Sequence, residues 1–384
     1  MKQTIYLDNG ATTKVDKSVV TAMCRYHDNH YGNASSIHHK GQEAQHALKK
    51  ARMIIADSID ADPLEIIFSS GGTESNNLAI KGIAFANRKK GNHIITSKIE
   101  HDCVINSCRW LEGQGFNVTY LDVDPQGFIR LDQLRSAITD QTILVSIIHG
   151  NNEIGTVQDL KSIYAICKKR GVVFHTDACQ SYTKTDLSCN HADLITINSH
   201  KIHGPKGVGG LFIKKGIRII PLSHGGGHER NLRSGTENIA GIVGFSKAVE
   251  VAMRQRTVNV EKMARLRDYF IERLLKIPKT ILNGTVGSKR LCNNINVSFE
   301  QIEGESIVAA LDQFSICAST GSACSSHSLD PSHVIMALEN NPERAHGSIR
   351  FSISRFTTKK EIDFALEKVK FAVNKLRDIS PLTK

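Results

Sequence analysis

A lysine that directly follows a predicted buried strand is the residue of this sequence best suited to covalent chemistry. Residues 194–197 form an apolar, β-branched run that predicts a buried strand, and a polar cluster with a Gly-Pro turn follows it. Lys201 lies in this cluster, where its amine could form an imine with a carbonyl compound. Because a lone lysine is usually an exposed surface residue, the rest of the chain must decide between the two interpretations.

Polar residues follow four further predicted strands. The strands are predicted from apolar runs at residues 66–68, 93–96, 142–148 and 172–175. The polar residues that follow them are, in the same order, Thr73, His101, Asn152 and Asp177. Helical patterns alternate with the strands, which predicts a mostly parallel sheet whose carboxyl ends gather ligand-binding side chains. Taken one at a time, Asp177 could equally cap a turn and His101 could be structural.

The first of these strands leads into a segment that could bind an anion. Residues 69–77 read Ser-Ser-Gly-Gly-Thr-Glu-Ser-Asn-Asn, and a helix is predicted directly after them. Free backbone N–H groups and the helix dipole at such a start attract a phosphate, and glycine lets the backbone approach it closely. Without further motifs, a plain helix cap is the simpler interpretation.

Two features near the carboxyl end could also do chemistry. Residues 318–327 are small, polar and interrupted by Gly321, which is typical of a mobile loop that would leave Cys324 accessible. Arg350 carries a planar fork that suits the carboxylate of an amino acid. Each feature also has a plain surface explanation when it is taken alone.

Together these motifs resemble the cysteine desulfurases, a branch of the class V aminotransferases. Residues 196–210 are similar to the cofactor-lysine motif of that family, and residues 69–77 to its phosphate-binding motif. Similar segments occur in order along the chain, at residues 5–13, 31–38, 223–238, 318–327 and 347–352. The resemblance extends from about residue 5 to residue 377 and is to the group that serves nitrogen fixation and general iron–sulfur cluster assembly.

The resemblance implies an α/β fold of the fold-type I pyridoxal-phosphate-dependent transferases, like that of aspartate aminotransferase. A large cofactor-binding domain, residues 13–255, would contain a mostly parallel seven-stranded sheet. A smaller α+β domain, residues 1–12 and 256–384, would carry the catalytic cysteine loop. The strand order does not follow from the pattern.

The implied cofactor is pyridoxal 5'-phosphate, bound covalently by Lys201. Asp177 would keep the ring nitrogen protonated, His101 would stack on the ring, and Asn152 would donate to the phenolic oxygen. Thr236 would reach the phosphate of a neighbouring subunit, which implies a homodimer with shared sites. The full implied cofactor-binding set is Gly72, Thr73, His101, Asn152, Asp177, Gln180, Asn198, Ser199, His200, Lys201 and Thr236.

The implied reaction removes sulfur from L-cysteine and releases L-alanine. The catalytic residues would be Cys324, Lys201 and His101, with Asn152 and Arg350 holding the substrate. Cys324 would take the sulfur as a persulfide and pass it to an iron–sulfur scaffold or another acceptor protein. No metal site is implied, apart from a transient contact of Cys324 with an iron–sulfur cluster.

The composition sets broad limits on partners. The chain has 384 residues with 40% hydrophobic and 23% charged residues, as expected of a soluble globular protein. The net charge is +11, but the lysines are scattered, which favours a solvated basic surface over direct nucleic-acid binding. An acidic partner protein or a tRNA stays an alternative.

The cysteine content favours a reducing compartment. Nine cysteines at irregular spacing, with no Cys-x-x-Cys pair, argue against a disulfide framework or a zinc site. The first residues lack the apolar core of a signal peptide, and no apolar run reaches membrane-spanning length. We therefore expect a cytoplasmic protein with no membrane partner.

Some residues depart from the family pattern, and two other functions stay open. Asn198 stands where the family commonly has a serine, and Cys103 and Cys179 stand where small apolar residues are usual. The chain could be another pyridoxal-phosphate enzyme, such as a selenocysteine lyase or an aminotransferase, or a catalytically idle scaffold-binding protein. Cys324 argues against an aminotransferase, which needs no thiol, and Lys201 argues against an idle protein.

Overall fold

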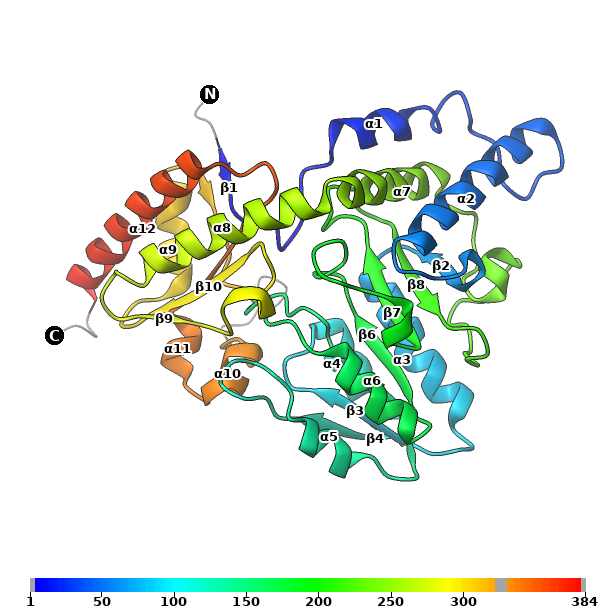
Figure 1. The fold of residues 1–384 in the computed structure, drawn as a ribbon, viewed down its shortest axis with the longest axis horizontal. Helices are drawn as coiled ribbons and strands as arrows, with labels where there is room; N and C mark the ends of the chain where they lie inside the picture. The colour runs from blue at the N-terminus through cyan, green and yellow to red at the C-terminus, as the bar shows by residue number, and fades with distance from the viewer. Residues whose placement is uncertain (1–3, 322–329, 381–384) are drawn as a thin grey trace.

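A seven-stranded sheet forms the centre of the larger part of the molecule (Figure 1). The computed structural model describes residues 4–321 and 330–380. In spatial order, the strands of the sheet are β2 (Ile66–Ser69), β8 (Gly209–Ile213), β7 (Leu194–Asn198), β6 (Val173–Asp177), β5 (Thr142–Ser146), β3 (His93–Ser97) and β4 (Asn117–Leu121). Every predicted strand near a candidate site residue is present, and the order supplies what the sequence pattern left open.

Only β8 runs against its neighbours in this sheet. It pairs antiparallel with β2 and with β7, whereas β7, β6, β5, β3 and β4 pair parallel. The mostly parallel sheet predicted from the alternation of strands and helices is therefore confirmed. Because β7 and β8 are antiparallel, the segment with Lys201 connects adjacent strands at the edge where the parallel strands end.

Helices cover both faces of this sheet, as a parallel sheet requires. The alternating side chains of β2 show the division, since Ile67 packs with one apolar cluster and Ile66 and Phe68 with the other. The first face is covered by α3 (Gly72–Asn87) and α4 (Asp102–Glu112). The helices that contribute to the second face are α1 (Lys17–Cys24), α2 (His39–Asp57), α5 (Leu131–Ala137), α6 (Leu160–Lys169) and α7 (Ile239–Arg254).

A third apolar cluster is formed mainly by the chain after residue 256, together with the amino-terminal arm. Its antiparallel sheet has the order β12 (Ser348–Ser352), β10 (Asn294–Phe299), β9 (Thr280–Leu282). The arm adds β1 (Ile5–Tyr6), which pairs parallel with β11 (Ile316–Cys317), and Leu7 is fully buried. The helices around these strands are α8 (Arg256–Leu274), α9 (Gly304–Asp312) and α12 (Lys359–Ile379).

Two short helices near the carboxyl end belong to a different core from their neighbours in sequence. Apolar residues of α10 (His333–Glu339) and α11 (Pro342–His346) pack with the cluster of the large sheet. The domain division at residues 12/13 and 255/256 stays a prediction. By sequence these two helices belong to the predicted smaller domain, but they pack on the core of the large sheet. Thr358 and Glu361 bond reciprocally at the start of α12 and form a capping box.

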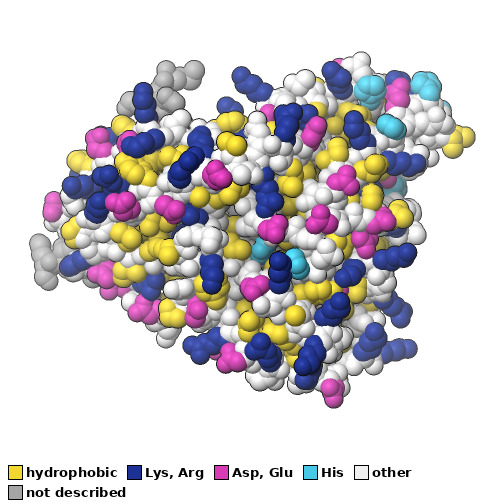
Figure 2. Space-filling view, viewed as in Figure 1, with side chains coloured by type: hydrophobic (Ala, Val, Ile, Leu, Met, Phe, Trp, Pro, Cys, Tyr) yellow, Lys and Arg dark blue, Asp and Glu magenta, His cyan; other side chains and the backbone are white. Residues whose placement is uncertain are grey.

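The surface has no single basic face in the view of Figure 2. Lysine and arginine side chains are spread over the visible side and alternate with acidic and apolar ones. This distribution agrees with the scattered lysines in the sequence. Within the described residues, no helix has both the length and the apolar character needed to cross a membrane.

A buried histidine next to the predicted site makes the fold sensitive to acid. His175 on β6 is fully buried between the hydroxyls of Ser146 (2.8 Å) and Thr196 (3.0 Å). Burial lowers the pKa of His175 from 6.5 to about 4. The unfolded chain therefore takes up a proton first as the pH falls. The contribution of His175 to stability is complete above pH 6.5 and is lost progressively toward pH about 4.

We expect His175→Gln to flatten the fall of the unfolding free energy between these two pH values. Urea unfolding at a series of pH values measures this slope. His27→Gln is the matched control, because His27 is exposed and its replacement should leave the slope unchanged. Equal slopes for wild type and His175→Gln would contradict the assignment.

Candidate active site

The amino-terminal arm closes over Lys201. The Lys201 ammonium donates to the carbonyl oxygens of Gly10 and, at 3.0 Å, of Ala11. The Gly10 carbonyl also accepts a 2.8 Å hydrogen bond from the side chain of Gln180. A Cβ at Gly10 would lie 3.1 Å from the Ser352 hydroxyl oxygen, so the arm has little space for a larger residue there. The arm thus connects Lys201 to Gln180, two residues that the sequence placed in one site.

Asp177 lies at the end of β6 and is 5% exposed. Its Oδ1 accepts a 2.9 Å hydrogen bond from the Cys179 N–H, and its Oδ2 accepts a 2.6 Å hydrogen bond from the Asn76 amide. The two hydrogen bonds, one to each oxygen, fix the orientation of the carboxylate. Asp177 therefore presents an oriented carboxylate at the end of the parallel strands.

His101 is the N-cap of α4. Its Nδ1 accepts a 3.2 Å hydrogen bond from the Cys103 N–H and lies 3.2 Å from the Cys103 Sγ. The residue before His101, Glu100, is fully buried, and its carboxyl accepts hydrogen bonds from the Ser97 hydroxyl (2.6 Å) and the Ile148 N–H (2.9 Å). Burial raises the pKa of Glu100 to about 8, so this carboxyl is mostly neutral at pH 7.

The predicted anion-binding segment has the properties that a phosphate needs. Gly72 is the first residue of α3, and among the described residues no side chain caps this helix. A Cβ at Gly72 would lie 2.6 Å from the Cys179 Sγ and 3.6 Å from the Asn198 Nδ2, so these loops meet closely. Thr73 follows Gly72 and is exposed.

Two residues at the end of β7 or just after it have buried polar atoms without partners. The Asn198 Oδ1 and the Ser199 Oγ are buried with no hydrogen-bond partner in the described structure. Such atoms are costly unless a ligand satisfies them. Both residues belong to the cofactor-binding set that the resemblance implies.

His200 is a neutral imidazole in this fold. Its Nδ1 lies 3.2 Å from the Thr12 hydroxyl, and its backbone carbonyl accepts from the Thr13 hydroxyl at 2.9 Å. Burial lowers the pKa of His200 to about 4, and the charge of Lys201 lowers it further. His200 therefore adds no charge to the site at neutral pH.

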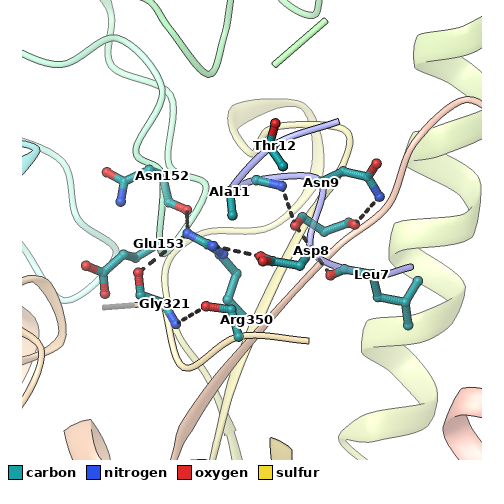
Figure 3. A network of polar contacts seen from close by, with 12 residues as sticks. Leu7, Asp8, Asn9, Ala11, Thr12, Asn152, Glu153, Gly321 and Arg350 are labelled. Atoms are coloured by element: carbon teal, nitrogen blue, oxygen red, sulfur yellow. Dashed lines mark hydrogen bonds and ion pairs between the residues drawn. The ribbon is translucent and has the colours of Figure 1, made fainter. Parts of the chain in front are cut away.

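Arg350 joins both halves of the molecule (Figure 3). It is 3% exposed, and its guanidinium bonds to the Asp8 carboxylate (2.9 Å), the Asn152 carbonyl (3.1 Å) and the Gly321 carbonyl (3.5 Å). Its Nε is buried with no partner in the described structure, and so is the Asn152 Oδ1. Arg350 and Asn152, predicted to hold the substrate, are therefore in contact and retain unused polar atoms.

Two of the predicted site residues are not brought to this place by the described structure. Cys324 lies outside the described residues. Thr236 is exposed in the segment before α7. Within the described residues, no group of three or more His, Cys, Asp or Glu side chains could hold a metal ion.

Sequence reasoning missed two residues that the structure adds to the site. Asn76 contacts Asp177, and Asp8 contacts Arg350. Both stand inside motifs that the sequence singled out, residues 69–77 and 5–13, so position in a motif was the available signal. Their partners are distant in sequence, and only the fold identifies them.

The chain belongs to the class V aminotransferase family. The profile of the aminotransferase class-V family matches residues 5–364. A relative from Methanosarcina thermophila, named cysteine desulfurase IscS, is 52% identical over 99% of this chain and 94% of its own length. A relative of the same name from Dictyoglomus turgidum is 50% identical over 99% of this chain and 97% of its own.

Solved structures of two other proteins resemble the fold of this chain over most of its length. A protein described as NifS-like has a TM-score of 0.92 at 35% identity, over 97% of this chain and 100% of the other. SspA, solved in complex with cysteine, has a TM-score of 0.82 at 37% identity, over 92% and 100%. Within its family the chain is a cysteine desulfurase with the fold-type I architecture, and its cofactor is pyridoxal 5'-phosphate.

The described residues fit this cofactor. The lysine amine, the carboxylate of Asp177 and the uncapped start of α3 provide partners for an aldehyde, a pyridinium nitrogen and a phosphate. The Asn198 Nδ2, which can donate to a phosphate, would lie 3.6 Å from a Cβ at Gly72 and so faces the start of α3. The cofactor assignment therefore agrees with the donors at this helix start.

We expect Asn198→Ser to bind the cofactor within about tenfold of wild type. An amide and a hydroxyl can each supply one neutral hydrogen bond, which contributes roughly 0.5–1.5 kcal/mol. Asn198→Ala should bind more weakly than Asn198→Ser by that amount. Cofactor titration followed by absorbance measures the affinities. Asn190→Ser, at an exposed asparagine, is the control. A larger loss for the serine variant would show that the amide is required.

Proposed function

We propose that Lys201, Asp177, His101, Arg350 and Cys324 carry out the desulfuration of L-cysteine in this protein. The observation that carries the proposal is the meeting of Lys201, Asp177 and Arg350 through the amino-terminal arm and the ends of the parallel strands. When bound, pyridoxal phosphate supplies an electron sink for the substrate α-carbon.

Lys201 holds the cofactor and carries the substrate α-proton. Its contacts with the Gly10 and Ala11 carbonyls support this role, because these acceptors stabilise a protonated amine without adding a fixed charge. Asp177 keeps the ring nitrogen protonated through its own charge. Gly72, Thr73, Asn198 and Ser199 hold the phosphate, with His200 and Gln180 beside them.

Arg350 binds the carboxylate of L-cysteine. Its unpartnered buried Nε supports this role, because an N–H without an acceptor favours entry of an anion. The Asp8 carboxylate bonds to the Arg350 Nη2, so the guanidinium keeps its orientation when no substrate is bound. Asn152, whose backbone carbonyl accepts from Arg350, is the second residue proposed to bind the substrate.

Cys324 attacks the substrate sulfur as a thiolate. A bond forms between the two sulfur atoms while the Cβ–S bond of the substrate breaks. The electron pair of that bond stays with the carbon skeleton, which takes up protons and leaves as L-alanine. Cys179 is unsuited to this role, because burial and the neighbouring Asp177 raise the pKa of its thiol well above the usual range.

A homodimer and an outside acceptor complete the proposal. Thr236 is exposed in its own chain, which supports a role at the phosphate of a second subunit. The persulfide on Cys324 passes to an iron–sulfur scaffold or another sulfur-acceptor protein. All eight described cysteines are free, which supports a reducing compartment such as the cytoplasm.

Lys201→Ala should lose covalent attachment of the cofactor. Borohydride treatment followed by peptide mass spectrometry should label Lys201 in the wild type and no lysine in the variant. Lys184→Gln is the matched control, because Lys184 is a nearby lysine that bonds to the Gln180 carbonyl at 2.8 Å, and its variant should keep the label on Lys201. A stable label on another lysine, with Lys201 unlabelled, would overturn the assignment.

Cys324→Ser should bind the cofactor and L-cysteine but release almost no sulfide, because a serine hydroxyl cannot form the persulfide. Cys317→Ser, seven residues earlier and outside the site, should keep wild-type turnover. Mass spectrometry of all nine cysteines after one turnover locates the persulfide. A persulfide on Cys103 or Cys179, with Cys324 unmodified, would refute the role of Cys324.

A further inference from the structure

The amide of Asn76 bridges two groups of the site. Asn76 is fully buried on α3, and its Nδ2 donates to the Asp177 Oδ2 (2.6 Å) and to the Cys103 Sγ (3.1 Å). The reverse orientation of the amide would place its oxygen against the carboxylate oxygen of Asp177. Since two acceptors repel at that distance, the orientation of the amide is fixed.

Cys103 continues this chain of contacts to His101. Its Sγ accepts from Asn76 and lies 3.2 Å from the His101 Nδ1, to which the thiol hydrogen can be donated. The Cys103 N–H donates to the same nitrogen at 3.2 Å. A nitrogen that accepts hydrogen bonds carries no proton of its own, so neutral His101 bears its proton on Nε2.

We propose that Asn76 and Cys103 form a hydrogen-bond relay from Asp177 to His101 that fixes His101 in its Nε2–H tautomer. Both are positioning residues, since they act through Asp177 and His101. In this arrangement His101 exchanges protons through Nε2, while Nδ1 stays engaged at the start of α4. The consequence for catalysis rests on the role proposed above for His101, but the tautomer itself does not.

The two acidic residues next to His101 agree with a proton on Nε2 rather than on Nδ1. A carboxylate next to an imidazole would compete for the Nδ1 proton by accepting a hydrogen bond from it. The neighbouring Glu100 carboxyl is mostly neutral, its Oε1 accepts from Ser97 and from the backbone of Ile148, and its Oε2 has no hydrogen-bond partner in the described structure. The side chain of Asp102, the first residue of α4, points elsewhere, since its Oδ1 lies 4.0 Å from His333.

The test uses histidine labelled with nitrogen-15 in the full protein, with and without bound cofactor. Two-bond proton–nitrogen spectra at a pH where histidine is neutral report which ring nitrogen carries the proton. The His101 signals are assigned by their loss in His101→Asn. Cys103→Ala and Asn76→Asp break the relay, and Cys103→Ser restores a donor. Asn77→Ala is the matched control, because its amide bonds to the Thr73 carbonyl (2.9 Å) and not to the relay.

We expect wild type, Cys103→Ser and Asn77→Ala to show the Nε2–H tautomer. In Cys103→Ala and Asn76→Asp the backbone N–H of residue 103 remains as a donor to Nδ1, so an added Nδ1–H population should appear beside the Nε2–H form. We expect kcat to fall by about threefold to tenfold with KM unchanged, as the loss of one hydrogen bond predicts. Wild-type spectra in both relay variants would overturn the relay. Because these spectra do not depend on turnover, they separate its failure from a failure of the proposed function, which lysine labelling and persulfide location test.

Discussion

The amino-terminal arm supplies partners for the two cations of the site, and the rest of the arrangement depends on this. Lys201 donates to the carbonyls of Gly10 and Ala11, and Arg350 bonds to Asp8. Arg350 is buried, and a buried charge without partners costs several kcal/mol, so its guanidinium could not stay in this place if the arm were displaced. The arm also pairs with β11 and buries Leu7, which connects the site to the core of the smaller part.

These contacts of the amino-terminal arm connect the proposed cofactor site with the proposed substrate site. The ends of the parallel strands provide the proposed cofactor groups, and β12 provides the guanidinium proposed to bind the substrate. Asp8 and the carbonyls that accept from Lys201 belong to one turn, in which the Ala11 N–H bonds to the Asp8 carbonyl at 3.1 Å. This turn therefore sets the position of Arg350 relative to Lys201.

Local patterns predicted most of the site, and distant contacts account for the rest. Apolar runs located β2, β3, β5, β6 and β7, and the rule that ligands bind at the ends of parallel strands grouped the residues that follow them. Strand order, the packing of α10 and α11 on the large core, and the partners of Asp8 and Asn76 were not predictable. Each depends on contacts between residues of different elements, such as Asn76 with Asp177 and Asp8 with Arg350, and periodicity along the chain carries no information about such contacts.

The unsatisfied polar atoms link folding to ligand binding. The Asn198 Oδ1, Ser199 Oγ, Asn152 Oδ1 and Arg350 Nε are buried without partners in the described structure, and each stands where the cofactor or the substrate is proposed to bind. Leaving such an atom unpaired costs about 1–3 kcal/mol, which the ligand-free fold must bear. A ligand that satisfies these atoms returns that free energy as affinity and, by mass action, as stability of the folded state. The two amide oxygens accept and the Arg350 Nε donates, so these residues favour a ligand that carries both hydrogen-bond donors and an anionic group.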